Sequence, residues 1–335
     1  MILVTGGTGL IGSHLLFHLV SHGKAVRSNY RTKESIEKVH TVFGYYTDDP
    51  ALLVEQIDWV KADITEVGGL DSLFTGVEQV YHCAALISFD PKDFKALERT
   101  NVEGTANIVN LSLKYGIKKL CYVSSIAAIG SNIKQKEVTE ENEWNDAMAS
   151  VYGISKYEAE LEVWRGSQEG LSIVIVNPGV VIGPGFWKRG SGTFFTYASK
   201  GKKYVIPGGT GFVTINDVVS TMMKLMDSSI QTERFILVNQ NMTYEQLFQK
   251  IAPKLGVEPP TKKVSKFMLE CFWRWDWIRS HLFGKRRKLS KNMAKGLYHQ
   301  EFYSSEKIKS ELDFTFEDMD EALAFCCEKF RVPQE

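Results

Sequence analysis

The chain lacks the features that mark secreted, membrane-spanning and nucleic-acid-binding proteins. It has only five cysteines in 335 residues, none of them in a C-x-x-C pair, so we interpret them as reduced thiols of a cytoplasmic protein. No apolar run approaches the roughly 18 residues that a membrane-spanning helix needs. The formal net charge is +0, which argues against a general nucleic-acid binder and predicts no nucleic-acid partner.

The most informative stretch lies at the start of the chain. A short apolar run meets Gly6, Gly9 and Gly12, and a helix-compatible apolar segment follows over 10–20. This order predicts a strand, a glycine turn and a helix N-terminus, whose N–H groups and dipole favour a bound phosphate. The spacing G-x-x-G-x-x-G differs from the commoner G-x-G-x-x-G, and a tight turn without a ligand is the alternative interpretation. Since the strand starts at the first residues, we expect no signal peptide.

Strand-like and helix-like segments alternate through the first half of the chain. This alternation predicts an α/β fold with a Rossmann-like doubly wound parallel sheet over residues 1–178. Further strands are expected over 24–31, 58–64, 79–85, 119–125 and 172–177, helices over 95–115 and 152–167, and an irregular insert over 41–50.

The second half of the chain has a different texture, with many glycines in the loops that follow Pro178. Because the chain exceeds the usual size of a single core, we expect a smaller C-terminal α/β substrate domain over 179–335. Segments near 212–240 are expected to return to the first domain. Short strands are predicted over 204–207 and 234–238, and helices over 216–227 and 244–255.

Tyr152 and Lys156 form the second strong signal. Residues four apart share one face of a helix, so the phenol and the ammonium are expected to point the same way. A nearby cation favours the phenolate and would lower the tyrosine pKa from its usual value of about 10, which would make Tyr152 a proton carrier. A surface pair on an amphipathic helix is the alternative. Ser124 and Ser125 end a predicted strand, at the sheet edge where ligands bind in open α/β folds; loop capping is their alternative role.

Six motifs follow one another along the chain, starting at Thr5 (T-G-G-T-G-L-I-G), His82 (H-C-A-A), Asn101 (N-V-E-G-T), Val123 (V-S-S), Tyr152 (Y-x-x-x-K) and Asn177 (N-P-G-V-V-I-G-P). In this order they resemble the extended short-chain dehydrogenase/reductases, the NAD-dependent epimerase/dehydratase family. The resemblance covers residues 1 to about 240 and continues weakly to the end of the chain.

The resemblance implies a role for each motif. Tyr152 would be the acid/base, and Ser125 aligns with the catalytic serine or threonine of the family. Lys156 would hold the nicotinamide ribose, and Asn101 would hold the active-site backbone. The implied cofactor-binding residues are Gly6, Thr8, Gly9, Leu10, Ile11, Gly12, Asp63, Ile64, Ala84, Ala85, Ser124, Tyr152, Lys156, Pro178 and Val181. The helix with Tyr152 and the helix over 95–115 pair in many relatives, which implies a homodimer.

The residues after the second predicted strand favour NADP over NAD. NAD-preferring members usually place an acid there for the ribose 2′-hydroxyl, whereas this chain has no acid before Glu34. Arg31 could instead meet a 2′-phosphate, with Lys33 adding charge. The alternative is a solvated Arg31 in an enzyme that accepts NAD.

The reaction is predicted from what surrounds Ser125. Sugar 4,6-dehydratases of the family carry an acidic pair directly after this residue, and here the chain has Ile126, Ala127 and Ala128. The motifs more resemble the dihydroflavonol-4-reductase-like and 3β-hydroxysteroid dehydrogenase-like branch. This implies an NADP(H)-dependent oxidoreductase that interconverts a carbonyl and an alcohol on a fairly apolar small molecule.

Two alternatives to this function stay open. One is a nucleotide-sugar epimerase with tightly bound NAD, although Asn177 stands where many sugar-nucleotide members have arginine. The other is a non-catalytic dinucleotide-sensing protein. The aromatic residues Phe89, Phe186, Trp187 and Phe194 are predicted to contact the substrate, and a place in the core of the smaller domain is their alternative.

Residues 262–295 hold eleven Lys or Arg against two acids and three closely spaced tryptophans. One interpretation is a packed helix with Met268, Phe272, Trp275, Ile278 or Arg279, and Leu282 on its buried face. The other is peripheral contact with an anionic membrane, helped by Lys285, Arg286, Arg287 and Lys288.

Two further patterns are interpreted as structural. Asp217 is expected to cap a helix or anchor hydrogen bonds. His14, His18 and His22 recur at intervals of four residues, but no carboxylate accompanies them, so we predict no metal site there.

Overall fold

A seven-stranded parallel sheet forms the centre of the computed structural model, which describes residues 1–130, 137–145, 149–283 and 296–331. The strand order is β10-β6-β5-β4-β1-β2-β3. Strands β2 and β3 therefore extend the sheet on one side of β1, and the later strands extend it on the other side. The strands are β1 (Ile2–Thr5), β2 (Val26–Tyr30), β3 (Asp58–Lys61), β4 (Gln79–His82), β5 (Lys119–Val123), β6 (Ile173–Pro178) and β10 (Glu233–Leu237). The predicted α/β, Rossmann-like doubly wound sheet is confirmed.

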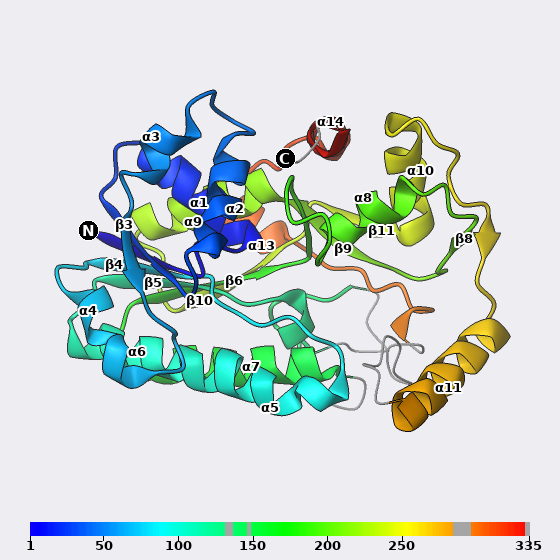
Figure 1. Cartoon of the computed structure of the whole chain (residues 1–335). Helices are drawn as coiled ribbons and strands as arrows, with labels where there is room; N and C mark the ends of the chain where they lie inside the picture. Colours follow the sequence, from blue (N-terminus) through cyan, green and yellow to red (C-terminus); the bar gives the residue numbers. More distant parts are fainter. Residues whose placement is uncertain (131–136, 146–148, 284–295, 332–335) are drawn as a thin grey trace.

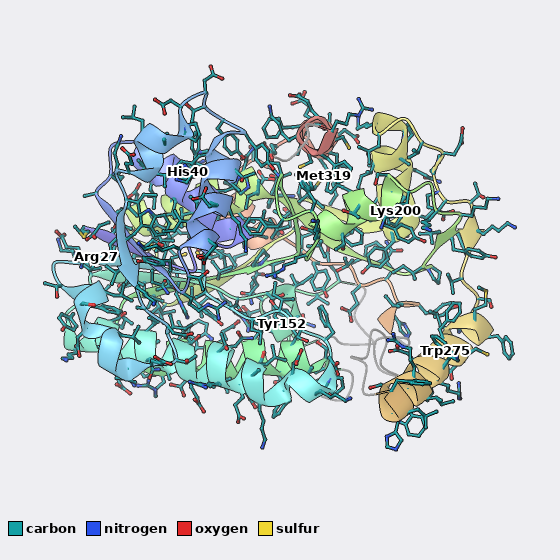
Figure 2. The ribbon with its side chains drawn as sticks, in the orientation of Figure 1. Arg27, His40, Tyr152, Lys200, Trp275 and Met319 are labelled. Atoms are coloured by element: carbon teal, nitrogen blue, oxygen red, sulfur yellow. The ribbon has the colours of Figure 1, made fainter. Side chains whose placement is uncertain are left out.

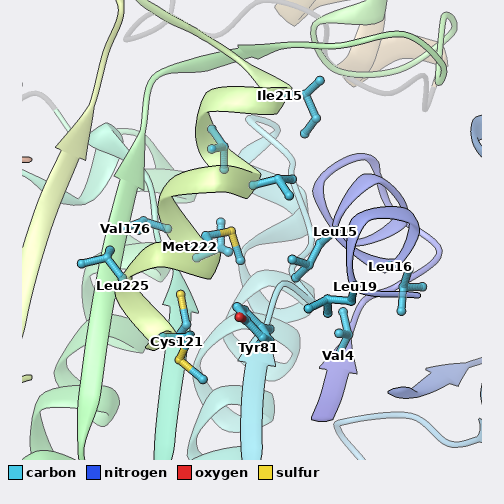
Figure 3. Packing of buried hydrophobic residues seen from close by; sticks show 14 of the residues in the cluster. Val4, Leu15, Leu16, Leu19, Tyr81, Cys121, Val176, Ile215, Met222 and Leu225 are labelled. Carbon is cyan, nitrogen blue, oxygen red and sulfur yellow. The ribbon is translucent and has the colours of Figure 1, made fainter. Parts of the chain in front are cut away.

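Helices cover both faces of this sheet (Figure 1). One face carries α1 (Leu10–Ser21), α2 (Glu34–Phe43), α3 (Pro50–Val54) and α9 (Ile215–Asp227), and the other α4 (Asp71–Phe74), α5 (Phe94–Leu97), α6 (Gly104–Lys114) and α7 (Val151–Gln168). Successive strand residues therefore alternate between two cores: Leu3 belongs to one cluster and Val4 to the other. Figure 3 shows the cluster that contains Val4, in which Leu15 of α1 and Met222 of α9 pack near Val4 and Tyr81.

A smaller mixed sheet lies beside the large one. Its order is β11-β9-β7, formed by β7 (Val180–Ile182), β9 (Gly209–Thr214) and β11 (Gln240–Thr243). The other elements of this region are α8 (Gly192–Ala198), β8 (Tyr204–Val205), α10 (Tyr244–Lys254), β12 (Lys262–Lys263), α11 (Lys266–Phe283), α13 (Glu306–Leu312) and α14 (Met319–Arg331). Phe195 of α8, Phe248 of α10 and Leu323 of α14 share its core. The chain returns to the large sheet through α9 and β10.

The structure corrects several boundaries. The insert expected over 41–50 is irregular only over 44–49, because α2 continues to Phe43, which is fully buried, and α3 starts at Pro50 under the Asp49 cap. The helix expected over 95–115 contains a π-helical turn, Glu98–Glu103. The short strands β7, β9 and β11 went unpredicted, since two of the residues in β9 are glycines and glycine is depleted in strands.

The packed-face prediction for α11 is wrong for most of its residues, although Met268 packs against Leu269 and Arg279 is half-buried. The side of α11 that faces the protein carries Leu269, Trp273, Asp276 and Ser280, whereas Trp275 is 65% exposed. Phe272, Ile278 and Leu282, which were expected on the same buried face, are exposed as well. Lys285 to Lys288 lie outside the described residues. Within the described ranges, no helix is long and apolar enough to cross a membrane.

Candidate active site

The glycine turn between β1 and α1 requires residues without a Cβ atom at positions 6 and 12. Gly6 has φ +71°, and a Cβ there would lie 2.6 Å from the Ala84 backbone. A Cβ on Gly12 would lie 2.3 Å from the carbonyl oxygen of Gly6. Helix α1 starts after Gly9 with no side-chain cap and no acid in its first turn. Its first N–H groups are therefore suited to an anion, and the turn fits the pyrophosphate of a dinucleotide.

The Gly12→Ala variant is expected to lose at least about tenfold in dinucleotide affinity, because the added methyl must displace the Gly6 carbonyl and open the turn. Gly68→Ala is the matched control, since a Cβ there meets nothing within 4 Å. Isothermal titration with NADPH and NADH measures both variants. Equal affinities in the two would contradict this assignment of the turn.

Asn29 fixes the glycine turn from the neighbouring strand. Its Oδ1 accepts a hydrogen bond from the Gly6 N–H at 3.2 Å, and its Nδ2 donates to the Ala62 carbonyl at 3.0 Å. The amide thus ties together the C-terminal ends of β1, β2 and β3. Sequence reasoning missed this residue; a polar side chain near the end of a buried strand was the available signal.

The residues predicted for the adenosine half of the cofactor follow the same ends of β2, β3 and β4. Arg31 and Lys33 are exposed directly after β2. Asp63 follows β3 and accepts hydrogen bonds from Thr65 N–H and Oγ1, both at 3.0 Å. Ile64 is buried against Gly104, and Ala84 and Ala85, which were predicted to line the ribose face, follow β4. Thr8, Leu10 and Ile11, which were predicted to cradle the pyrophosphate, are half-buried at the glycine turn after β1.

Tyr152 lies buried in the first turn of α7, where the Ser150 side chain caps the helix (Figure 2). Burial raises the pKa of Tyr152 to about 12, against the opposing effect of a hydrogen bond with Ser125. The Phe89 ring lies edge-on to the phenol ring, with centroids 5.5 Å apart. The protein alone therefore raises the phenol pKa, whereas the sequence had predicted that Lys156 would lower it.

The Lys156 ammonium is directed to β5. It donates to the Tyr122 hydroxyl at 2.6 Å and to the Val123 carbonyl at 2.8 Å, and it lies 4.3 Å from the centre of the Tyr122 ring. Burial lowers the pKa of Lys156 to about 7, and the carboxylate of Glu160 acts in the opposite direction. Lys156 lies on the same helix as Tyr152 and is anchored to the C-terminal end of β5, the strand that Ser125 follows.

Asn101 connects the loop after β4 to α7. Its Oδ1 accepts from the Leu86 N–H at 2.7 Å, and its Nδ2 donates to the Leu86 carbonyl at 3.0 Å and to Ser155 Oγ at 2.9 Å. The residue lies in the π-helical turn, Glu98–Glu103. Its side chain thereby joins the Leu86 backbone to Ser155 of α7.

The buried carboxylate of Glu160, which the sequence analysis did not single out, hydrogen-bonds the residues at the C-terminal end of β5 and in β6. Glu160 is 1% exposed and accepts hydrogen bonds from Ser124 Oγ at 2.7 Å and Asn177 Nδ2 at 3.0 Å. Arg234 of β10 pairs with it at 3.1 Å. Asn177 also donates to the Ser125 carbonyl at 3.0 Å. The signal was the spacing, since Glu160 follows Lys156 by four residues on α7.

The residues predicted to contact the substrate separate into two groups. Phe89 is 42% exposed beside Tyr152, and Phe186 is half-buried with φ 56°. Trp187 is 7% exposed and packs on Phe195 and Phe330. Phe194 packs in the same core. Trp187 and Phe194 therefore belong to the core of the smaller sheet. The sequence could not show this, because a residue that fills a core and one that lines an apolar pocket look alike in sequence.

The two residues predicted for the nicotinamide end of the cofactor lie on successive strands of the chain. Pro178 ends β6, and Val181 of β7 pairs with β9.

His14 and Asp217 have structural partners. Buried His14 bonds Tyr46 Oη at 2.7 Å and the Pro184 carbonyl at 3.0 Å, and burial lowers its pKa to about 4. Asp217 accepts from the Glu317 N–H at 2.9 Å and Asn239 Nδ2 at 3.2 Å, as expected of a hydrogen-bond anchor. Among the described residues, no group of three metal-binding side chains occurs.

A doubly wound sheet with a glycine turn at its first strand, and with serine, tyrosine and lysine gathered around the ends of β5 and α7, defines a nicotinamide-dinucleotide-dependent enzyme. The model of the NAD dependent epimerase/dehydratase family matches residues 2–237. The chain belongs to that family.

Among curated proteins, the chain is 27% identical to a putative dihydroflavonol 4-reductase of Synechocystis sp.. The aligned region covers 96% of this chain and 92% of the relative. It is 29% identical to tetraketide alpha-pyrone reductase 2 of Arabidopsis thaliana, over 78% of this chain and 85% of the relative. Sterol demethylase protein B of Methylococcus capsulatus is 26% identical, over 77% of each chain.

Solved structures show the same fold. UDP-glucose 4-epimerase of Thermotoga maritima superposes with a TM-score of 0.77 over 98% of each chain, at 22% identity. The enzyme WbmH of Bordetella bronchiseptica, in complex with NAD+, has a TM-score of 0.74 at 20% identity, over 99% of this chain and 98% of that chain.

Proposed function

We propose that the protein is an NADP(H)-dependent reductase that interconverts a carbonyl and an alcohol on a fairly apolar small molecule. The observation that carries the proposal is the buried phenol of Tyr152, hydrogen-bonded with Ser125 and flanked by Phe89. The relatives named as dihydroflavonol and tetraketide alpha-pyrone reductases support the same class of reaction.

In the proposed reaction, each of the residues around Tyr152 would have a separate role. The glycine turn with Gly6 and Gly12 would hold a nicotinamide dinucleotide, which would supply the hydride for the carbonyl carbon. Tyr152, whose pKa of about 12 keeps it protonated near neutral pH, donates its proton to the carbonyl oxygen, and Ser125 donates a hydrogen bond to the same oxygen. Lys156 contributes positive charge when protonated, and Asn101 keeps the Leu86 backbone in place.

The apolar character of the substrate is inferred from the surroundings of Tyr152. Phe89 lies directly against its ring.

Asn177 is the residue that bears on the epimerase alternative. It is neutral and fully buried, and its amide nitrogen already bonds Ser125 and Glu160. It therefore offers no cation for a sugar diphosphate, which disfavours the epimerase alternative.

A spectrophotometric screen tests the function. The purified chain, NADPH and a panel of apolar ketones and aldehydes are expected to show loss of reduced-cofactor absorbance, with UDP-sugars inactive. Release of tightly bound NAD on denaturation, together with conversion of a UDP-sugar, would instead assign the epimerase.

Arg31 is proposed to select NADP by meeting the 2′-phosphate. Arg31→Glu is expected to weaken NADPH binding by roughly tenfold to a hundredfold, because a charge-assisted contact worth about 1.5–3 kcal/mol is replaced by repulsion. NADH affinity should stay the same. Lys24→Glu, an equal charge change at an exposed site before β2, is the control. Equal loss for both cofactors, or none, would contradict the assignment.

A further inference from the structure

Helix α11 carries an apolar stripe on the side that faces away from the protein. Phe267, Cys271, Trp275, Ile278 and Leu282 recur at intervals of three and four residues, so they share one face. All five are exposed, with Phe267 at 77%, Trp275 at 65% and Leu282 at 69%. Such a contiguous exposed stripe is unusual for a surface without a partner. Figure 1 shows the helix at the periphery of the molecule, and Figure 2 labels Trp275 on it.

The opposite face of α11 attaches it to the neighbourhood of the active site. Leu269, Asp276 and Ser280 are buried on this face. Ser280 Oγ accepts a hydrogen bond from Lys92 Nζ at 3.0 Å. Lys92 follows Phe89 by three residues in the loop after β4, and Phe89 is the residue whose ring contacts Tyr152. The helix is therefore tied to the loop that borders the catalytic tyrosine.

The charges around the stripe point to an anionic surface. Over 262–283 the chain has five Lys or Arg against two acids, and Lys285, Arg286, Arg287 and Lys288 come next in the sequence, outside the described residues. Arg274 and Arg279 flank the stripe, and each is paired with an acid of the same helix. Tryptophan and phenylalanine on an exposed helix face, next to basic residues, are the composition of helices that lie in the headgroup region of a bilayer.

We propose that α11 docks on an anionic lipid bilayer, with Phe267, Trp275, Ile278 and Leu282 inserted at the interface. The helix then holds the Phe89 loop close to the bilayer, so that an apolar substrate would reach Tyr152 from the lipid phase. This last consequence rests on the proposed function, whereas the docking itself does not.

Vesicle flotation of the full chain tests the docking, with phosphatidylcholine alone and with a mixture of phosphatidylcholine and phosphatidylglycerol. The wild type is expected to float with the anionic vesicles and much less with the neutral ones. The stripe variant Trp275→Gln/Leu282→Gln should bind more weakly by at least about tenfold, since two large apolar side chains no longer leave water. Leu52→Gln/Val67→Gln is the matched control, because these two residues are 58% and 55% exposed elsewhere.

The outcomes separate docking from folding and from catalysis. Unchanged melting temperatures and unchanged NADPH affinity in both double variants show that the fold is intact. Absence of wild-type binding to anionic vesicles, or equal binding by the stripe and control variants, overturns the proposal. A wild-type dimer that the stripe variant converts to a monomer, without vesicle binding, would assign the stripe to a second copy of the chain and also overturn it. No turnover enters the assay, so failure of the proposed reductase activity leaves its result unaffected.

Discussion

Tyr152→Phe is expected to lower kcat by roughly 10²–10⁴-fold, the usual contribution of a positioned proton donor. The substitution removes one oxygen and leaves the ring, so the edge-on contact with Phe89 is kept. Because the phenol is buried with a raised pKa, it enters the reaction protonated, and Ser125 is the side chain that hydrogen-bonds with it. Dinucleotide affinity and melting temperature should stay close to those of the wild type.

Tyr157→Phe is the matched control for this prediction. It makes the same chemical change on the same helix, at a ring that stacks on Trp144 with centroids 4.3 Å apart. Steady-state kinetics with a confirmed carbonyl substrate compare the two variants. Turnover by Tyr152→Phe within a factor of about three of the control would exclude Tyr152 as the proton donor.

Arg234→Met is expected to destabilise the protein by roughly 3 kcal/mol, the largest effect on stability that we predict. Removing one partner of a buried ion pair leaves the other charge uncompensated, and such changes cost about 3–5 kcal/mol. We take the lower end because Arg234 is 20% exposed and because Ser124, Asn177 and Trp164 still donate to the Glu160 carboxylate. The arginine also donates to the carbonyls of Glu140 and Asn142, and these bonds are lost with it.

Denaturant unfolding of the single and double variants separates the charge from the packing. Arg234→Met/Glu160→Gln should be more stable than Arg234→Met, because the amide carries no charge and needs no cation. Lys250→Met, at an exposed ion pair with Asp320, is the control and should cost less than about 1 kcal/mol. A double variant less stable than the single variant would contradict the assignment of Arg234 as the counter-charge of Glu160.

The parts of the site that were predictable are those that repeat a local pattern. The glycine turn needs residues without Cβ atoms at fixed intervals, and the structure places Gly6 and Gly12 where any side chain would collide with backbone. The alternation of β6 between the two cores follows from its buried apolar run. The fold class, the family and the class of enzyme were predicted for this reason.

The contacts that were not predictable join residues far apart in the chain. Arg234 lies 74 positions from Glu160, and Asn29 reaches Gly6 from a neighbouring strand. The destination of the Lys156 ammonium was also missed, because helical spacing says which face a side chain leaves from and not which strand receives it. On α11, the same spacing that predicted a buried stripe describes an exposed one.

The sequence by itself determined the doubly wound sheet, the dinucleotide turn at its first strand and the chemical types that gather around Tyr152. These follow from periodicity, backbone sterics and residue chemistry, which act over a few residues. Only the tertiary structure decided the protonation of Tyr152, the counter-charge of Glu160 and the outward direction of the α11 stripe. Burial and pairing set all three, and both depend on which distant segment packs against a side chain and how much water it excludes.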